Sequence, residues 1–272
     1  MIEHISTTKK RVVASLGVAL IGAAITSPVA SAQTLTTLVS FDGISAAAPY
    51  SALIADTNGN LFGTTAYGGS IFAQAGTVFE IGKTATGYAS VPTILGSFDG
   101  ANGANPYTGL TADTNGNLFG TTYFGGAYGN GTVFEIVKTA TGYSTPNVLV
   151  SFDGANGGSP FSGVLADTNG DLFGTTIIGG STFAGTVFEI VKAATGYSST
   201  PNFLVTFDRA NGAGLYAGLI ADATGNLFGT TANGGLVGQG TAFEITGSGF
   251  VALVRFAGVP GTSNCHGAAP LL

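Results

Sequence analysis

Carboxylates recur along this 272-residue chain, and two of the recurring sets are candidates for the chemistry that carboxylates perform in glycoside hydrolysis and divalent-cation binding. One set opens an Asp-rich turn and comprises Asp56, Asp113, Asp167 and Asp222. The other set lies in a GT-[VA]-FEI motif and comprises Glu80, Glu135, Glu189 and Glu244. One function that stays open is therefore a carboxylate-based hydrolase, lyase or lactonase that uses a divalent metal.

The Asp-rich turns resemble the start of a calcium loop, because Asp56, Asn58 and Asn60 alternate as oxygen ligands do in an EF-hand. An EF-hand also needs glycine at its sixth position and glutamate at its twelfth, but here Gly59 is fourth and Tyr67 is twelfth. An irregular Ca²⁺ site at the four aspartates stays open. The favoured interpretation is structural: Asp56 accepts backbone N–H groups while Asn-Gly makes the bend, and no cofactor is expected.

The repeated glutamates favour a structural role. A catalytic site usually combines unlike residues, whereas the same residue type occupies this position in all four copies. Such a structural role would be pairing with Lys83, Lys138 and Lys192 or hydrogen bonding to the backbone. Conventional nucleophiles are scarce, because Cys265 and His266 are adjacent in a Gly/Ser/Pro-rich tail and cannot face each other as a dyad. The residues therefore favour a protein that is not an enzyme.

Positions that differ between the copies are better candidates for binding, since variable loops on a rigid scaffold usually carry recognition. They follow a repeated Thr-Thr and continue into the loops 70–75, 127–130, 181–184 and 236–239. The candidate binding residues are Tyr67, Phe72, Tyr123, Phe124, Tyr128, Phe183 and Asn233. The aromatic members could form a platform for sugars or peptides, and packing between repeats is the alternative that stays open.

These residues sit in a tandem repeat. The motif LFGTT starts at residues 61, 118, 172 and 227, so the copies are 57, 54 and 55 residues apart. Asn-Gly between apolar runs predicts a hairpin that joins a strand at Leu53–Ala55 to one at Leu61–Thr65. A third strand is expected at Thr77–Ile81, and a strand such as Val148–Phe152 closes the unit.

Four short strands per repeat predict an all-β fold, a β-propeller-like array of four four-stranded repeats. An incomplete or open ring is an expected variant, and so is a ring completed by a second chain. Leu35–Phe41 and Phe250–Phe256 are expected to be strands of one type, either of which could close the ring by pairing across the termini. A β-solenoid is disfavoured, because its coils are usually about 20–30 residues long.

The N-terminus predicts a cleaved secretion signal, residues 1–32. Lys9–Arg11 is basic, Val12–Ile25 is apolar, and Ala30-Ser31-Ala32 is a cleavage site. The protein is therefore expected to be secreted, periplasmic or at the cell surface. The predicted organisation is a repeat domain at 33–258, with repeats at about 35–87, 88–142, 143–196 and 197–249 and a closing strand at 250–258, followed by a flexible tail at 259–272.

The charge balance restricts the partners. Removal of Lys9, Lys10, Arg11 and Glu3 leaves 5 of the 8 basic and 13 of the 14 acidic residues, a net charge of −8. Such a surface repels phosphate backbones, so nucleic acid is not an expected partner. No segment after the signal is expected to span a membrane. The expected partners are a glycan or a surface protein, with a homo-oligomer as a further option for completing the ring.

The motif series N-G-N-L-F-G-T-T, G-G, G-T-V-F-E-I and S-F-D-G-A-N-G-A-N-P-Y resembles the choice-of-anchor GloVer-containing proteins, whose unit is the Gloeo/Verruco repeat. The resemblance covers residues 35–258 in four copies. It implies an exported bacterial protein, often attached to the surface by a C-terminal sorting signal, in a family without an established activity. Gly258–Leu272 shows neither an apolar helix nor a basic cluster, which leaves release or a truncated reading frame as the expectations.

Overall fold

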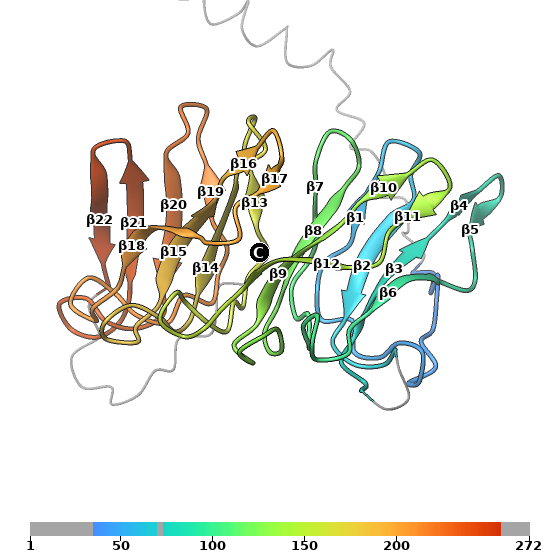
Figure 1. Ribbon diagram of the computed structural model, residues 1–272, viewed down its shortest axis with the longest axis horizontal. Helices are drawn as coiled ribbons and strands as arrows, with labels where there is room; N and C mark the ends of the chain where they lie inside the picture. The colour runs from blue at the N-terminus through green and yellow to red at the C-terminus, as the bar shows by residue number, and fades with distance from the viewer. Residues whose placement is uncertain (1–34, 70–72, 257–272) are drawn as a thin grey trace, which may run out of the picture. The chain divides into compact units, whose positions relative to one another are not determined.

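The computed structural model describes residues 35–69 and 73–256 of the chain. The chain divides after Thr37, and the unit that begins at Leu38 is described by itself. Its described residues form four four-stranded antiparallel sheets in chain order, each called a blade here (Figure 1). No helix in these ranges is long and apolar enough to cross a membrane. The predicted all-β, propeller-like array of four-stranded repeats is confirmed.

Each blade takes its strands from consecutive stretches of one repeat. Blade 1 contains β1 (Ile54–Ala55), β2 (Leu61–Thr65), β3 (Thr77–Ile81) and β6 (Thr93–Ser97); blade 2 contains β7 (Thr111–Ala112), β8 (Leu118–Thr122), β9 (Thr132–Ile136) and β12 (Asn147–Ser151). Blade 3 contains β13 (Leu165–Ala166), β14 (Leu172–Thr176), β15 (Thr186–Ile190) and β18 (Asn202–Thr206); blade 4 contains β19 (Ile220–Ala221), β20 (Leu227–Thr231), β21 (Thr241–Thr246) and β22 (Gly249–Arg255). The expected second and third strands of the first repeat coincide with β2 and β3.

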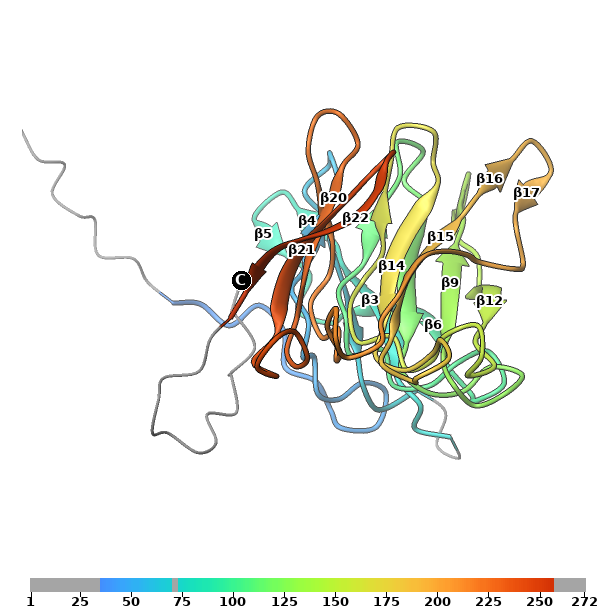
Figure 2. The ribbon, with the colours of Figure 1, turned by 90° about the vertical axis from the view of Figure 1, so that its left-hand side faces the viewer.

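A small hairpin is inserted between the third and fourth strands of blades 1 to 3. The three hairpins are β4–β5 (Lys83–Thr84 and Gly87–Tyr88), β10–β11 (Lys138–Thr139 and Gly142–Tyr143) and β16–β17 (Lys192–Ala193 and Gly196–Tyr197). Figure 2 shows β16–β17 projecting beyond its sheet. In blade 4, β21 turns directly into β22, because Thr246 pairs with Gly249. Blade 4 therefore lacks the lysine and tyrosine that the other hairpins carry.

The glycine of LFGTT is required by its cross-strand neighbour. Gly120 pairs with Phe134 across β8 and β9, and a Cβ built on Gly120 would lie 2.6 Å from the Phe134 ring atom Cζ. The phenylalanine ring thus covers the glycine backbone, and any side chain there would displace it. The same pairing recurs in the other blades.

The two threonines of LFGTT have different partners. The first binds the next blade: Thr121 Oγ1 donates to the Ser162 carbonyl at 2.9 Å, as Thr64 does to Thr108 and Thr175 does to Ala217. The second stays within its blade, since the Thr122 and Thr132 hydroxyls lie 2.8 Å apart. Both sets are buried and hydrogen-bonded, as buried hydroxyls must be to avoid a desolvation penalty.

In blades 1 to 3, the phenylalanine that follows the fourth strand packs against the next blade. The ring centroids are 5.0 Å apart for Phe98 and Phe134, 5.2 Å for Phe152 and Phe188, and 5.3 Å for Phe207 and Phe243. All six rings are buried. An aspartate follows each of Phe98, Phe152 and Phe207, and the phenylalanine of this repeated Phe-Asp motif therefore forms a contact between blades.

Of the two strands expected at the ends, the one at Phe250–Phe256 forms as β22 but is not a spare strand, and the one at Leu35–Phe41 does not form. β22 is the fourth strand of blade 4, paired with β21, because this blade would otherwise lack its outer strand. The segment Leu35–Phe41 belongs to no sheet, since no third strand among the described residues is left for it to pair with. The predicted signal at 1–32 and the predicted tail at 259–272 lie outside the described residues.

Candidate functional site: an aromatic belt and an adjoining cavity

The segments that contain the first strands of consecutive blades lie next to one another. Each segment has an aromatic or apolar stretch at one end and an Asp-rich turn at the other. A Cβ built on Gly163 of blade 3 would lie 3.1 Å from the Gly109 carbonyl oxygen of blade 2. In blade 1 an aromatic residue, Tyr50, precedes this stretch and Asp56 follows it. Because the extended strand β1 lies between Tyr50 and Asp56, the aromatic residue and the Asp turn lie at opposite ends of this stretch.

At the aromatic end, one ring per blade forms a continuous row. The rings of Tyr50, Tyr107, Phe161 and Tyr216 occupy the same position in the four repeats. Successive centroids are 5.9, 5.7 and 5.8 Å apart, distances typical of favourable aromatic pairs. Every repeat thus contributes one ring to a surface that runs across all four blades.

Residues after the Thr-Thr pair widen this row. Tyr123 lies 5.8 Å from Tyr107, 5.7 Å from Phe161 and 4.4 Å from Phe124 between ring centroids. The hydroxyls of Tyr67 and Tyr107 are 3.4 Å apart. The aromatic belt is defined here as Tyr50, Tyr67, Tyr107, Tyr123, Phe124, Phe161 and Tyr216. All its members except Tyr107 and Tyr123 are exposed, so the belt faces solvent.

The central tyrosine of the belt stays neutral over a wide pH range. The hydrogen bond with Tyr67, followed by partial burial, raises the pKa of Tyr107 to about 12. Tyr107 therefore carries no phenolate charge at neutral pH. Its chemistry is that of ring faces and hydroxyl groups.

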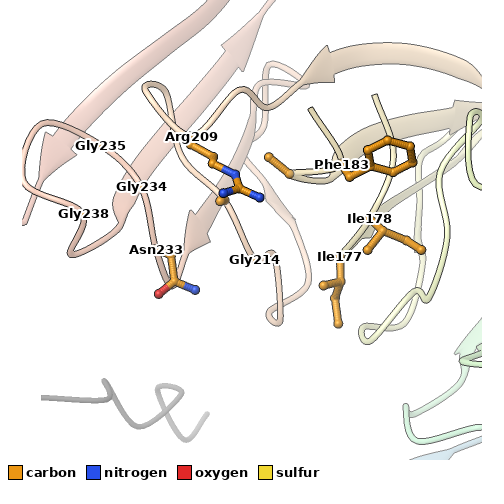
Figure 3. A pocket seen from close by; sticks show the side chains of 11 residues that line it. Ile177, Ile178, Phe183, Arg209, Gly214, Asn233, Gly234, Gly235 and Gly238 are labelled. Carbon is orange, nitrogen blue, oxygen red and sulfur yellow. The ribbon is translucent and has the colours of Figure 1, made fainter. Parts of the chain in front are cut away.

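A cavity of about 510 Å³ lies between the loops of blades 3 and 4. Ile177, Ile178 and Phe183 form an apolar side, while Arg209 and Asn233 supply polar groups (Figure 3). The cavity adjoins the belt, because Gly214 lines it and a Cβ on Gly214 would lie 3.2 Å from Tyr216 Cε2. An apolar surface with a few polar groups is typical of small-ligand sites.

Arg209 occupies a backbone position at which the other repeats have glycine. Its φ is 72°, and the equivalent Gly43, Gly100 and Gly154 have φ values of 80°, 91° and 90°. A residue with a side chain is disfavoured there by about 1–2 kcal/mol. Figure 3 shows the guanidinium directed toward the side of the cavity that carries Phe183 and Ile178. Its planar array of donors suits carboxylate or sulfate oxygens.

At the opposite end, the Asp carboxylates accept hydrogen bonds from residues of their own turns. Asp113 Oδ1 accepts the backbone N–H groups of Asn115 and Asn117, both at 2.9 Å, and Oδ2 accepts the Asn117 side-chain amide at 3.0 Å. Asp56, Asp167 and Asp222 also accept backbone N–H groups two and four residues ahead. The turns of blades 2 to 4 line a hollow of about 800 Å³. Their oxygens shape these turns, and among residues 35–69 and 73–256 no group of three or more His, Cys, Asp or Glu side chains is placed to hold a metal ion.

Two of the glutamates, Glu80 and Glu135, are influenced electrostatically by a lysine of the following repeat. Burial raises the pKa values of Glu80 and Glu135, while Lys138 and Lys192 respectively oppose this effect. Lys192 Nζ also lies 3.9 Å from Asp113 Oδ2. The expected Glu–Lys association therefore runs from the glutamate of one repeat to the lysine of the next repeat in the same chain. It belongs to the packing between blades.

The candidate binding residues divide between the two features. Tyr67, Tyr123 and Phe124 join the belt, whereas Phe183 and Asn233 line the cavity. Tyr128 is exposed, and within the described ranges it forms no aromatic pair. Phe72, Cys265 and His266 lie outside the described residues. Sequence reasoning missed Tyr50, Tyr107, Phe161, Tyr216 and Arg209; the signals were an aromatic residue at one repeat position and arginine in place of a repeated glycine.

Comparisons with solved structures give distant similarities. Luciferin-regenerating enzyme is 18% identical with a TM-score of 0.46, covering 76% of this chain and 63% of that chain. A protein of unknown function from Dyadobacter fermentans is 12% identical with a TM-score of 0.48, covering 79% and 70%. A polysaccharide lyase, an ulvan lyase bound to -[GlcA(1-4)Rha3S]-, is 10% identical with a TM-score of 0.42, covering 74% and 56%. The chain thus spans less than two thirds of luciferin-regenerating enzyme and of this lyase.

A search of curated proteins found no match. The profile of the Gloeobacter/Verrucomicrobia repeat matches residues 84–270, well over half of the chain. The match includes the last three of the four LFGTT motifs. The chain belongs to the Gloeobacter/Verrucomicrobia repeat family.

Proposed function

We propose that this protein binds a glycan through the aromatic belt, without catalysis, at the bacterial surface or in the extracellular space. The observation that carries the proposal is the unbroken row of rings across four blades. Aromatic faces bind the C–H faces of sugars, while tyrosine hydroxyls serve as hydrogen-bond partners. A row that extends over several repeats suits an extended polysaccharide better than a single small molecule.

The adjoining cavity supports a more specific ligand. A sugar ring fits an apolar side built by Ile178 and Phe183, and a charged substituent on that sugar could bind Arg209. Arg209 is one of only five basic residues beyond position 32. The proposed ligand is therefore a polysaccharide that carries carboxylate or sulfate groups.

The non-catalytic part of the proposal is supported by the use of the carboxylates. In the Asp turns the carboxylate oxygens accept hydrogen bonds from backbone N–H groups. The belt itself contains no acidic side chain. Calcium is not part of the proposed binding, so EDTA is expected to leave the affinity unchanged. Membership of the repeat family is consistent with export and supports the extracellular setting.

Phe161→Ala is expected to weaken polysaccharide binding about tenfold or more. Phe161 is the ring that contacts Tyr107, Tyr123 and Tyr216, so its loss interrupts the belt at its centre. The measurement is isothermal titration calorimetry against soluble polysaccharides that bind the unaltered protein. Tyr128→Ala is the matched control, because Tyr128 is exposed but lies outside the belt. Equal losses in both variants, or no binding to a broad panel of neutral and acidic polysaccharides, would contradict the proposal.

Arg209→Gly is expected to affect the binding of a charged ligand and the stability of the protein in opposite directions. It restores the glycine found in the other repeats and relieves the positive φ, so the free energy of unfolding is expected to rise by up to about 1 kcal/mol. Affinity for an acidic polysaccharide is expected to fall, whereas affinity for a neutral analogue should not. Calorimetry with a carboxylated polymer and its carboxyl-reduced form makes the comparison. Unchanged affinity for the acidic polymer would remove Arg209 from the site.

A further inference from the structure

The three contacts between consecutive blades repeat one pattern. Each blade has a trailing face, which is the face toward the next blade, and a leading face toward the preceding one. The trailing face presents the first threonine of LFGTT, a fourth-strand residue and the phenylalanine that follows it; in blade 2 these are Thr121, Val150 and Phe152. The leading face presents a proline or leucine and, four residues later, an aliphatic residue; in blade 3 these are Pro160 and Val164.

The trailing face of blade 4 has this composition but is exposed. Phe256 is 46% exposed, whereas the equivalent Phe98, Phe152 and Phe207 are at most 1% exposed. Val254 is 49% exposed, whereas Val150 of blade 2 is 1% exposed. These side chains leave an apolar surface of the kind that the other blades bury, and such surfaces mark interaction sites.

The leading face of blade 1 is the matching half. Leu53 is 44% exposed, whereas its equivalents Leu110, Val164 and Leu219 are at most 8% exposed. Pro49 is exposed, whereas Pro106 and Pro160 are buried against glycines of the preceding blade. Since both faces are exposed in the single chain, its own blade 1 does not cover its own blade 4.

The charged and aromatic groups of blades 4 and 1 also match those that pair between consecutive blades. Between blades 1 and 2, Tyr143 packs on Phe62 with centroids 5.5 Å apart, and Lys138 acts on the ionisation of Glu80. Between blades 2 and 3, Tyr197 and Lys192 repeat these contacts with Phe119, Glu135 and Asp113. Blade 1 offers Lys83 and Tyr88 on the hairpin β4–β5, and blade 4 offers Phe228, Glu244 and Asp222.

We propose that the trailing face of blade 4 binds the leading face of blade 1 in a second copy of this chain. The docked pair repeats the internal pattern: Thr230 donates to the Ser51 carbonyl, Val254 and Leu53 become buried, and Lys83 approaches Glu244. One position is already occupied, because Phe41 lies 5.0 Å from Phe79, the ring that Phe256 would contact. Phe256 of one copy therefore replaces Phe41 of the other. The contact is heterologous, so it leads to a closed ring or to a chain of copies.

The unaltered protein is expected to have at least twice the monomer mass in size-exclusion chromatography with light scattering. Leu53→Glu and Val254→Glu are each expected to be monomeric, because each places a charge in one half of the contact. Both side chains are about half exposed, so circular dichroism and the melting temperature should show folded proteins. Val137→Glu is the matched control, an exposed valine in an interior blade that should leave the assembly intact.

Mixing the two monomeric variants tests the direction of the contact. Leu53→Glu retains an intact trailing face and Val254→Glu retains an intact leading face, so the mixture should give a 1:1 dimer that grows no further. Phe41→Ala should assemble at least as well as the unaltered protein, since it removes the competing ring. A monomeric unaltered protein, or variants that stay monomeric when mixed, would overturn the proposal. Loss of assembly in Phe41→Ala would overturn the exchange of the two phenylalanines.

Discussion

Replacing Gly131 with alanine is expected to cost about 4 kcal/mol or more of folding free energy, enough to unfold a typical domain in large part. Gly131 has a φ of 91°, and a Cβ there would lie 2.3 Å from the Thr122 carbonyl oxygen. It would also lie 2.8 Å from Pro160 Cδ of the next blade. The clash is with backbone and with a proline ring, so neither can move aside cheaply. Urea denaturation followed by circular dichroism measures the loss.

Gly129→Ala is the matched control in the same loop. Gly129 also has a positive φ, 78°, but no atom lies within 4 Å of the built Cβ. Its expected cost is only the backbone preference, about 1–2 kcal/mol. If the two variants lost equal stability, close packing between blades would not be the reason for glycine at position 131.

The sequence predicts the blades well because their signals are local. Asn-Gly between apolar runs places the turn between β1 and β2, and the run TVFEI at 77–81 is β3. The contact between the phenylalanine of the Phe-Asp motif and the next blade cannot be predicted in the same way. Phe152 follows β12 in the chain but packs against Phe188, and that contact depends on how blades stack. Periodicity within one repeat carries no information about it.

The candidate site was only partly predictable for a related reason. Tyr67, Tyr123 and Phe124 attract attention because the copies differ there. Tyr107 and Phe161 were overlooked because an aromatic residue occurs at that position in every copy, which suggests packing. In the structure, repetition of one ring per blade is what makes a continuous surface, with centroids 5.7 Å apart for this pair. In a repeat protein, a binding surface can therefore be built from positions that are alike as well as from positions that differ.

Phe152→Ala is expected to lower the free energy of unfolding by about 3–5 kcal/mol. The Phe152 ring is fully buried in a cluster that joins Val133 of blade 2 to Phe188 of blade 3, so its removal leaves a cavity between two blades. Phe183→Ala makes the same chemical change at an exposed ring and should cost no more than about 0.5 kcal/mol. Urea titration of both variants measures the difference. Because each blade is stabilised by its neighbours, a large loss at Phe152 would show that contacts between blades hold the array together. A loss no larger than that of Phe183→Ala would mean that the blades are stable without this contact.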